Sequence, residues 1–257
     1  MEPAGIRPEG TLASGAGPPH NEGQRRTAGL VLPDPAMEDL PFRDRTEAGR
    51  CLSKKLVAYA DRNDVIVLAL PRGGVPVGYE VAKALRVPLD AFLVRKLGAP
   101  GQEELAMGAI AAGGIRVLND EVVRLLHIPQ RVIDSVAAKE AQELARRDRL
   151  YRGTRPPPDV KGNTVILVDD GLATGSSMRA AVAALREQAP KRIVVAVPVA
   201  AAQTVREFSG EVDELVCCYT PEPFFSVGFW YEDFSQASDH EIRELLDHAA
   251  RDPASAT

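Results

Sequence analysis

Short apolar runs alternate with helical segments along most of this chain, and this alternation limits the possible folds more than any other feature. Each run has the length of a strand and lacks an alternating polar face, which is typical of strands buried on both sides of a parallel sheet. Five strands are predicted, at residues 65–70, 89–94, 164–168, 192–198 and 214–218. Helices are predicted at residues 46–60, 75–85, 176–188 and 201–208, and a last helix follows Ser238. The pattern predicts an α/β fold on a parallel sheet with right-handed crossovers.

The region between the second and third strands has a different pattern. Residues 95–105 are polar and contain glycine, so we expect a loop there. Two apolar runs, at 107–112 and 115–118, have the spacing of a tight hairpin. A short helix capped by Asn119 and a long helix at 129–151 should follow. Solvation and the helix dipole explain the arginines at the end of the long helix better than an anion site does: Arg146, Arg147, Arg149 and Arg152.

The two ends of the chain are expected to lie outside the folded domain. Residues 1–37 are dense in glycine and proline and show no hydrophobic period, which predicts disorder. This extension is either a linker or partner-binding tail, or an inert segment. We expect a single domain at residues 38–251 and a disordered tail at 252–257.

Composition and charge argue against two broad classes of protein. Lys and Arg number 31 against 36 Asp and Glu, which gives a net charge of −5, and no basic cluster is interleaved with aromatic residues. We therefore expect no nucleic-acid partner. No apolar run reaches the ~18 residues that a membrane span needs. The three cysteines form no CxxC pair and the N-terminus lacks a signal-peptide pattern, so a cytoplasmic protein without a disulfide framework is predicted.

The segment most informative about chemistry is residues 165–177, which reads Val-Ile-Leu-Val-Asp-Asp-Gly-Leu-Ala-Thr-Gly-Ser-Ser. Its apolar run delivers Asp169 and Asp170 to the C-terminal end of a buried strand, where ligands of open α/β sheets bind. A turn of small residues then leads into a helix N-terminus, whose N–H groups and dipole favour an anion. Two carboxylates beside a phosphate site are suited to hydrogen bonding with adjacent sugar hydroxyls.

This segment is neither a P-loop nor a GxGxxG fingerprint. It resembles the phosphoribosyl-diphosphate (PRPP) signature of type I phosphoribosyltransferases. The resemblance implies an open, mostly parallel sheet with helices on both faces, a small hood and a mobile loop. It also implies that Asp169 and Asp170 hold the ribose hydroxyls and stabilise positive charge on the reacting ribose. The 5′-phosphate would be bound by Ala173, Thr174, Gly175, Ser176 and Ser177.

Two further segments support the resemblance in the expected order. Arg72, Gly73 and Gly74 follow the first core strand and resemble the family's diphosphate loop, which often holds a non-proline cis peptide. Arg95 and Lys96 resemble the basic pair that opens the mobile catalytic loop, here residues 98–108, and would neutralise the departing diphosphate. Taken alone, the first motif is usually only a turn, and two cations at a strand end are commonplace.

Departures from the family pattern bear on the substrate. Ala173 stands where 6-oxopurine enzymes carry an acidic residue, and the two motifs look more like those of adenine phosphoribosyltransferases. Those enzymes place a carboxylate on the mobile loop, for which Glu103 and Glu104 are both candidates. Gly171 replaces the usual apolar residue after the acidic pair, which loosens the turn without removing a ligand.

Residues 220–236 form an aromatic segment where the family builds its acceptor-binding hood. Its candidates for holding a planar base are Val227, Trp230 and Tyr231. The alternative is that the segment packs over the sheet edge or forms a dimer contact. The four histidines lack ligand spacing, and no metal ligand is predicted among the protein's side chains.

The resemblance implies a phosphoribosyltransferase. Its partners would be PRPP, with Mg²⁺ bound mainly through PRPP, and a small nitrogen-containing acceptor such as a nucleobase. Homodimers are common in the family. Two alternatives stay open: a non-catalytic protein on the same fold that senses PRPP or nucleotides, and a hydrolase of another sugar phosphate.

Overall fold

The computed structural model describes residues 29–31 and 41–251, and its centre is a six-stranded parallel sheet. The strand order is β1-β9-β8-β7-β2-β3. The strands are β1 Gly29–Val31, β2 Val65–Ala69, β3 Leu89–Ala91, β7 Thr164–Val168, β8 Arg192–Val199 and β9 Glu214–Tyr219. All their pairings are parallel. The predicted parallel α/β fold is confirmed.

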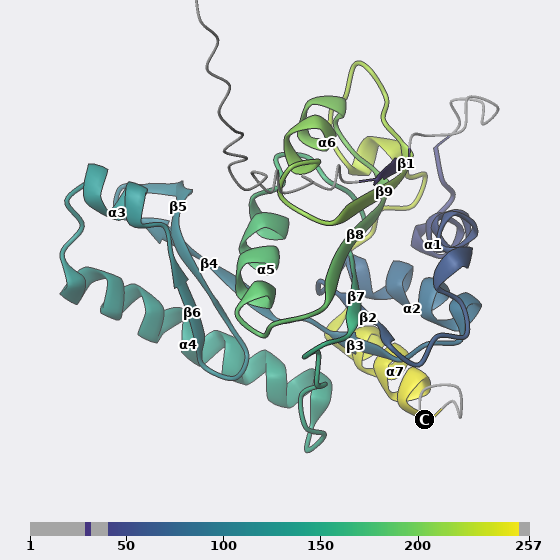
Figure 1. The fold of residues 1–257 in the computed structure, drawn as a ribbon, viewed down its shortest axis with the longest axis horizontal. Helices are drawn as coiled ribbons and strands as arrows, with labels where there is room; N and C mark the ends of the chain where they lie inside the picture. Colours follow the sequence, from purple (N-terminus) through teal and green to yellow (C-terminus); the bar gives the residue numbers. More distant parts are fainter. Residues whose placement is uncertain (1–28, 32–40, 252–257) are drawn as a thin grey trace, which may run out of the picture.

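Helices cover both faces of this sheet (Figure 1). One face carries α1 Arg45–Lys55, α2 Gly74–Leu85 and α7 Asp239–Arg251, and the other carries α5 Ser176–Arg186 and α6 Ala202–Phe208. Successive strand residues point to opposite faces, so Val67 belongs to the first core and Leu68 to the second. Burial on both faces explains why the strands read as continuous apolar runs.

The register of β2 against β7 brings two loops together. Val65 pairs with Thr164 and Ala69 with Val168, so both strands end at the same edge. The backbone N–H of Leu70 extends the ladder by donating to the Val168 carbonyl at 2.9 Å. Residues 70–74 and 169–177 therefore leave the sheet side by side at its carboxyl edge.

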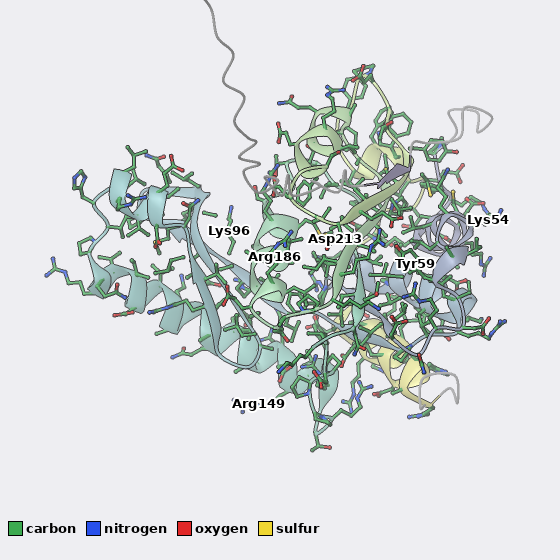
Figure 2. The ribbon with its side chains drawn as sticks, in the orientation of Figure 1. Lys54, Tyr59, Lys96, Arg149, Arg186 and Asp213 are labelled. Carbon is green, nitrogen blue, oxygen red and sulfur yellow. The ribbon has the colours of Figure 1, made fainter. Side chains whose placement is uncertain are left out.

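A second, antiparallel sheet projects from the core (Figure 1). It contains β4 Val94–Ala99, β5 Gln102–Ala111 and β6 Ile115–Leu118, and is followed by α3 Asp120–Leu125 and α4 Gln130–Arg152. The β5–β6 hairpin and the cap on α3 are confirmed, since Asn119 Oδ1 accepts from the Val122 N–H at 3.1 Å. Figure 2 shows Lys96 of β4 on the side of this sheet that faces α5.

Two predictions for this region are wrong. The strand expected at 89–94 is divided, because β3 ends at Ala91 and β4 joins the other sheet. The loop expected at 95–105 is a β-hairpin that turns at Pro100 and Gly101. Gly101 has a φ of +74°, which permits a two-residue turn after Pro100. In the strand before the turn, Leu97 and Ala99 are buried although their neighbours in the sequence are polar.

The ends of two segments also differ from expectation. Gly29–Val31, within the stretch predicted to be disordered, forms β1 against β9. The rest of that stretch (1–28 and 32–37) and the tail at 252–257 lie outside the described residues. The first long helix ends at Lys55 instead of residue 60, and a 3-10 turn, η1 Val57–Tyr59, follows it.

The described ranges contain no helix with the length and apolar character needed to cross a bilayer.

Candidate functional site

The two predicted anion loops meet at Asp170. A Cβ atom added to Gly73 would lie 1.9 Å from Asp170 Oδ2, and one added to Gly74 would lie 2.7 Å from the Val168 carbonyl oxygen. Such separations are far inside van der Waals contact, so both positions require glycine. The paired glycines thus allow the 71–74 loop to lie directly against the acidic segment.

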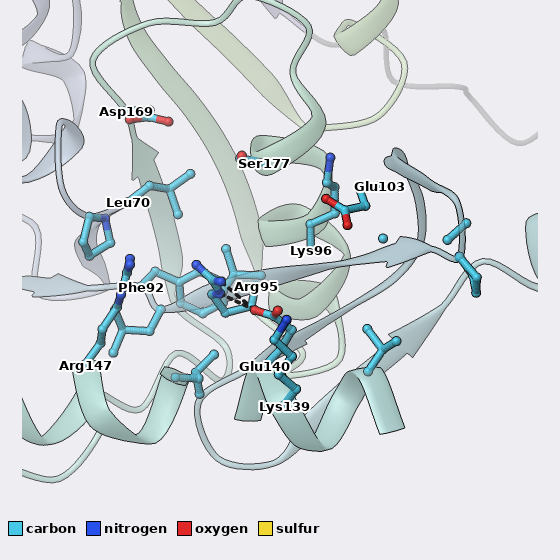
Figure 3. Close-up of a pocket in the computed structure, with 18 of the residues that line it drawn as sticks. Leu70, Phe92, Arg95, Lys96, Glu103, Lys139, Glu140, Arg147, Asp169 and Ser177 are labelled. Atoms are coloured by element: carbon cyan, nitrogen blue, oxygen red, sulfur yellow. Dashed lines mark hydrogen bonds and ion pairs between the residues drawn. The ribbon is translucent and has the colours of Figure 1, made fainter. Parts of the chain in front are cut away.

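Asp169 faces a cavity of about 640 Å³ between the two sheets. Leu70 and Ser177 line the same cavity from the core, and Figure 3 shows Asp169 and Ser177 on this wall. Asp169 Oδ1 accepts a hydrogen bond from the Asp170 N–H at 2.9 Å. Burial raises the pKa of Asp169 well above its usual range, and the adjacent Asp170 charge raises it further. The group is a carboxyl that holds its proton more tightly than an ordinary aspartate.

Asp170 is held by a residue that the motifs do not include. Arg45, at the start of α1, donates to Asp170 Oδ2 from Nε and Nη2, both at 2.9 Å. Only 12% of the Arg45 side chain and 15% of the Asp170 side chain are exposed. Burial raises the pKa of Asp170, and Arg45 opposes that effect. A sequence signal for Arg45 exists, because a cation in the first turn of a helix opposes the helix dipole and calls for a nearby anion.

The turn at 173–175 has the features of an anion site. No described residue accepts a hydrogen bond from the backbone N–H of Ala173, Thr174 or Gly175. The carbonyls of the turn are engaged instead, since Arg179 Nη1 donates to Thr174 O at 2.9 Å and Thr204 donates to Ala173 O. Gly175 has a φ of +75°, and its conformation directs the chain into α5. Ser177 is exposed at the same end of the helix, as are Ala173 and Thr174.

The 71–74 loop contains a cis peptide between Pro71 and Arg72, in agreement with the resemblance. Arg72 is half-buried, and its Nη1 lies 3.9 Å from Asp239 Oδ1 at the start of α7. The loop therefore presents one cation together with Gly73 at the edge of the site.

Arg95 and Lys96 lie on β4, not on a loop, and both line the cavity. Arg95 forms an ion pair with Glu140 of α4 at 2.6 Å, drawn in Figure 3. Glu103 of β5 also lines the cavity. The hairpin thus brings the predicted basic pair to the site by strand pairing.

The α4 helix supplies basic groups to the cavity, and one of them, Arg147, is among the arginines that were expected only to be solvated. Lys139 and Arg147 line the cavity opposite Asp169 (Figure 3). Arg152 is 6% exposed and pairs with Asp90, so its role is in packing. Arg149 is exposed on the outer side of α4 (Figure 2). A usable signal was the helical spacing of Val132, Val136, Lys139 and Arg147, which puts them along one face.

The hood candidates have different positions. Val227 packs against Gly171, where an added Cβ would lie 2.4 Å from Val227 Cγ1, so Gly171 makes room for the hood. Tyr231 is 5% exposed and donates from its hydroxyl to the Asp170 carbonyl at 2.6 Å, so it supports the acidic segment and offers no open face. Trp230 is half-buried, and its Nε1 has no hydrogen-bond partner within the described part of the chain. Among these three, Val227 and Trp230 remain candidates for contact with an acceptor.

Within residues 29–31 and 41–251, no group of three or more His, Cys, Asp or Glu side chains is placed so that it could hold a metal ion. The acidic pair is divided between two settings, with Asp169 at the cavity and Asp170 bound to Arg45. A metal ion at this site would therefore need most of its ligands from a bound substrate and water, which is the usual mode for Mg²⁺.

Known proteins share this sequence and fold. The profile of the phosphoribosyl transferase domain matches residues 44–233. A protein of Mycobacterium tuberculosis H37Rv, provisionally named a phosphoribosyl transferase, is 46% identical over 215 residues, which cover 84% of this chain and 48% of the relative. This chain thus spans about half the length of that relative. The crystal structure of TT1426 from Thermus thermophilus has 41% sequence identity and a TM-score of 0.74, and the match covers 80% of this chain and 98% of that one.

A more distant relative is a uracil phosphoribosyltransferase of Lactobacillus gasseri, 27% identical over 175 residues that cover 65% of this chain and 80% of the relative. The matched profile includes both anion loops and most of the hood segment. The resemblance carried by three short motifs therefore extends over most of the described domain. On this similarity of sequence and fold, the chain belongs to the phosphoribosyltransferase family.

Proposed function

We propose that this domain transfers the 5-phosphoribosyl group of Mg²⁺·PRPP to a nitrogen acceptor and releases diphosphate. The observation that carries the proposal is the contact of two anion loops across an acidic pair, where Gly73 lies against Asp170. PRPP carries a phosphate at one end of its ribose and a diphosphate at the other. An acidic pair with an anion loop on each side therefore matches the order of groups in PRPP. The domain would comprise residues 38–251, with residues 220–236 as its hood.

The 5′-phosphate would bind at the turn that begins α5. Three consecutive N–H groups without described acceptors, at Ala173, Thr174 and Gly175, support this assignment. The hydroxyls of Ser176 and Ser177 add donors, and the N-terminus of α5 adds the positive end of a helix dipole.

Asp169 and Asp170 would hold the ribose hydroxyls and oppose the positive charge that develops on the ribose as diphosphate departs. Electrostatic stabilisation of this kind is strongest where water is excluded. The burial that raises the pKa of both carboxyls supports such a setting. Reaction would require the ionised forms, because a neutral carboxyl gives little stabilisation to a cation.

Diphosphate would leave toward the cationic wall of the cavity. Arg72, Gly73 and Gly74 would hold it from the core, and Arg95 and Lys96 from the hairpin. Mg²⁺ carried on the diphosphate would neutralise part of the leaving-group charge, with Asp169, which lines the cavity, as a candidate protein ligand. Glu103 lines the same space and is the candidate for the loop carboxylate.

The acceptor would be a nucleobase bound beside Val227 and Trp230. The named activity of the Lactobacillus gasseri relative supports a base as acceptor. The half-buried indole of Trp230 and the position of Val227 against Gly171 support contact with a planar molecule.

Calorimetric titration of PRPP with and without Mg²⁺, followed by a screen of bases for diphosphate release, tests this function. We expect metal-dependent binding with a micromolar Kd, and release of diphosphate with one of the bases. The Asp169→Asn/Asp170→Asn double variant should lose transfer and keep its fold. Asp134→Asn, at an exposed ion pair with Arg116, is the matched control.

Three results would count against transfer. Binding of PRPP without diphosphate release from any base would favour a PRPP sensor. Wild-type rates in the double variant would overturn the role of the acidic pair. Absence of PRPP binding under all conditions would overturn the proposal as a whole.

A further inference from the structure

We propose that Arg179 is a positioning residue, which directs the backbone N–H groups of the 173–175 turn toward the phosphate by tying the carbonyl side of that turn to α6. This inference rests on the proposed 5′-phosphate site, but its first test does not depend on that site. Arg179 lies near the start of α5, shortly after the residues assigned to the phosphate.

Consecutive carbonyls of the phosphate turn all accept hydrogen bonds from α5 or from the start of α6. The acceptors are the carbonyls of Leu172, Ala173, Thr174 and Gly175. Arg179 serves two of them, because its Nη1 donates to Thr174 O at 2.9 Å and its backbone N–H donates to Gly175 O at 2.8 Å. The other two accept from the Ala201 N–H at 3.0 Å and from the Thr204 hydroxyl.

The geometry of the peptide bond converts these carbonyl contacts into an anion site. In a planar trans peptide, a carbonyl and the N–H that follows it point in opposite directions. Among the described residues, cis peptides occur at 71–72 and 222–223, so the peptides of the turn are trans. Carbonyls held toward the helices therefore direct the N–H groups of residues 173–175 to the other side of the turn. A row of such donors binds anions.

The Arg179 side chain is itself fixed by α6 Ala202–Phe208 and the residues after it. Its Nη2 donates to Glu207 and its Nε to Glu211, both at 2.9 Å. Its Cζ lies 4.7 Å from the centre of the Phe208 ring. A planar guanidinium can hold a carbonyl and two carboxylates at once, which a lysine ammonium cannot do with the same geometry.

The α6 helix packs directly behind the turn. A Cβ atom added to Gly175 would lie 2.5 Å from Phe208 Cε2 and 3.1 Å from Thr204 Cγ2. Thr204 is buried, although its hydroxyl is polar, and that hydroxyl is used by the Ala173 carbonyl. The turn thus has a packed side toward α6 and a donor side toward the ligand, and Arg179 connects the two.

The first test measures the rigidity of the turn without any ligand. In ¹⁵N-labelled protein, NMR relaxation gives order parameters for the amides of Thr174 and Gly175. We expect values of about 0.85 in the wild-type protein, as in rigid backbone, and a fall toward about 0.6 in Arg179→Met, because the Thr174 carbonyl loses its donor. Arg179→Lys should lower the values by less.

Arg186→Met is the matched control. Arg186 is exposed on the same helix and donates to the backbone carbonyl of Glu211, but it has no described contact with the turn. It should leave both order parameters unchanged. Flexible amides in the wild-type protein, unchanged values in Arg179→Met or an equal fall in the control would each overturn the inference. If Arg179→Met does not fold, Arg179→Lys decides, because wild-type values in that variant contradict the role of the guanidinium.

The second test compares two ligands by calorimetry, ribose 5-phosphate for the turn and Mg²⁺·diphosphate for the opposite side of the site. Arg179→Met should weaken the binding of ribose 5-phosphate by about tenfold, because ordering even one backbone residue on binding costs about this much. It should leave diphosphate affinity within about twofold of the wild-type value. A merely structural loss would weaken both ligands equally, and that result would contradict the inference.

The lysine variant separates positioning from charge. If Arg179 acted only by attracting the phosphate, Arg179→Lys would keep the wild-type affinity for ribose 5-phosphate, which would overturn the positioning role. If the wild-type protein binds neither ligand, the proposed function fails, and the relaxation measurement still decides whether Arg179 holds the turn.

Discussion

Gly73 and Asp170 show how one missing side chain positions a functional group. The backbone of the 71–74 loop occupies the space that a Cβ would need, and Asp170 Oδ2 lies against it. Arg45 donates to the same oxygen from Nε and Nη2. The orientation of this carboxylate thus depends on a glycine in one element and an arginine in another, neither adjacent to it in sequence.

Gly73→Ala should displace Asp170 and weaken Mg²⁺·PRPP binding by tenfold or more, as measured by calorimetry. The reason is steric, because the new methyl group and Asp170 Oδ2 cannot occupy the same space. Gly210→Ala is the control, since a Cβ there would meet nothing within 4 Å. Wild-type affinity in Gly73→Ala would contradict the described loop geometry.

Asp169→Asn should abolish transfer and raise thermal stability at pH 7–8. The folded-state pKa of Asp169 lies above its unfolded value, so its ionisation favours the unfolded state. Stability therefore falls as pH rises from the unfolded pKa, about 4, through the folded pKa. We expect the variant to gain about 2–4 °C in Tm, which corresponds to roughly 1 kcal/mol in a domain of this size. Scanning calorimetry at pH 4 should show a smaller difference, and a lower Tm at both pH values would contradict the assigned shift.

At the scale of elements, the β4–β5 hairpin and α4 form the wall opposite the acidic pair. The hairpin is joined to α4 by the Arg95–Glu140 ion pair at 2.6 Å. Glu140 thus competes with any anion for Arg95, because a carboxylate and a diphosphate oxygen use the same donors. Entry of diphosphate would require Arg95 to exchange or share its partner.

Glu140→Gln should strengthen the binding of Mg²⁺·diphosphate by about 3–10-fold, since roughly 1 kcal/mol is a factor of five in affinity. The change removes one negative charge from the cavity wall and frees the Arg95 guanidinium. Product inhibition in the transfer assay, or direct calorimetry, measures the effect. Glu121→Gln on the exposed surface of α3 is the control. Weaker diphosphate binding in Glu140→Gln would mean that the ion pair positions Arg95 instead of competing for it.

At the scale of the whole molecule, the site depends on a sheet that separates two hydrophobic cores. Successive residues of β2 and β7 alternate between those cores, and both strands end where the acidic pair begins. Packing on either face therefore determines where the carboxyl edge of the sheet lies.

Leu68→Ala should lower the free energy of unfolding by about 2–5 kcal/mol, because the residue is fully buried in the centre of the sheet. Val57→Ala, at a side chain that is 67% exposed, should change it by less than about 0.5 kcal/mol. Chemical denaturation measures both. Equal effects in the two variants would contradict the described burial.

Sequence patterns predicted five of the six strands of the parallel sheet and the loops at its carboxyl edge, because burial on both faces leaves an unbroken apolar run. They did not predict β1, which lies in the stretch expected to be disordered. They did not predict the β4–β5 hairpin, whose stability comes from pairing across Pro100 and Gly101 and from burial of Leu97 among polar neighbours. They also did not predict Arg45 or Lys139. Each of these side chains comes from a helix that is far in sequence from the acidic pair. It lies near the site only because that helix packs against one of the sheets.

Both edges of the large sheet are formed by very short strands, β1 and β3, each of three residues. An edge strand offers unpaired N–H and carbonyl groups to other chains, and a short edge gives a second copy little length along which to add. The long inner strands β8 and β9 are covered by neighbours on both sides. The large sheet therefore offers little edge to which a second copy could add, and the longer edges in the described part of the chain are those of β4 and β6 in the small sheet.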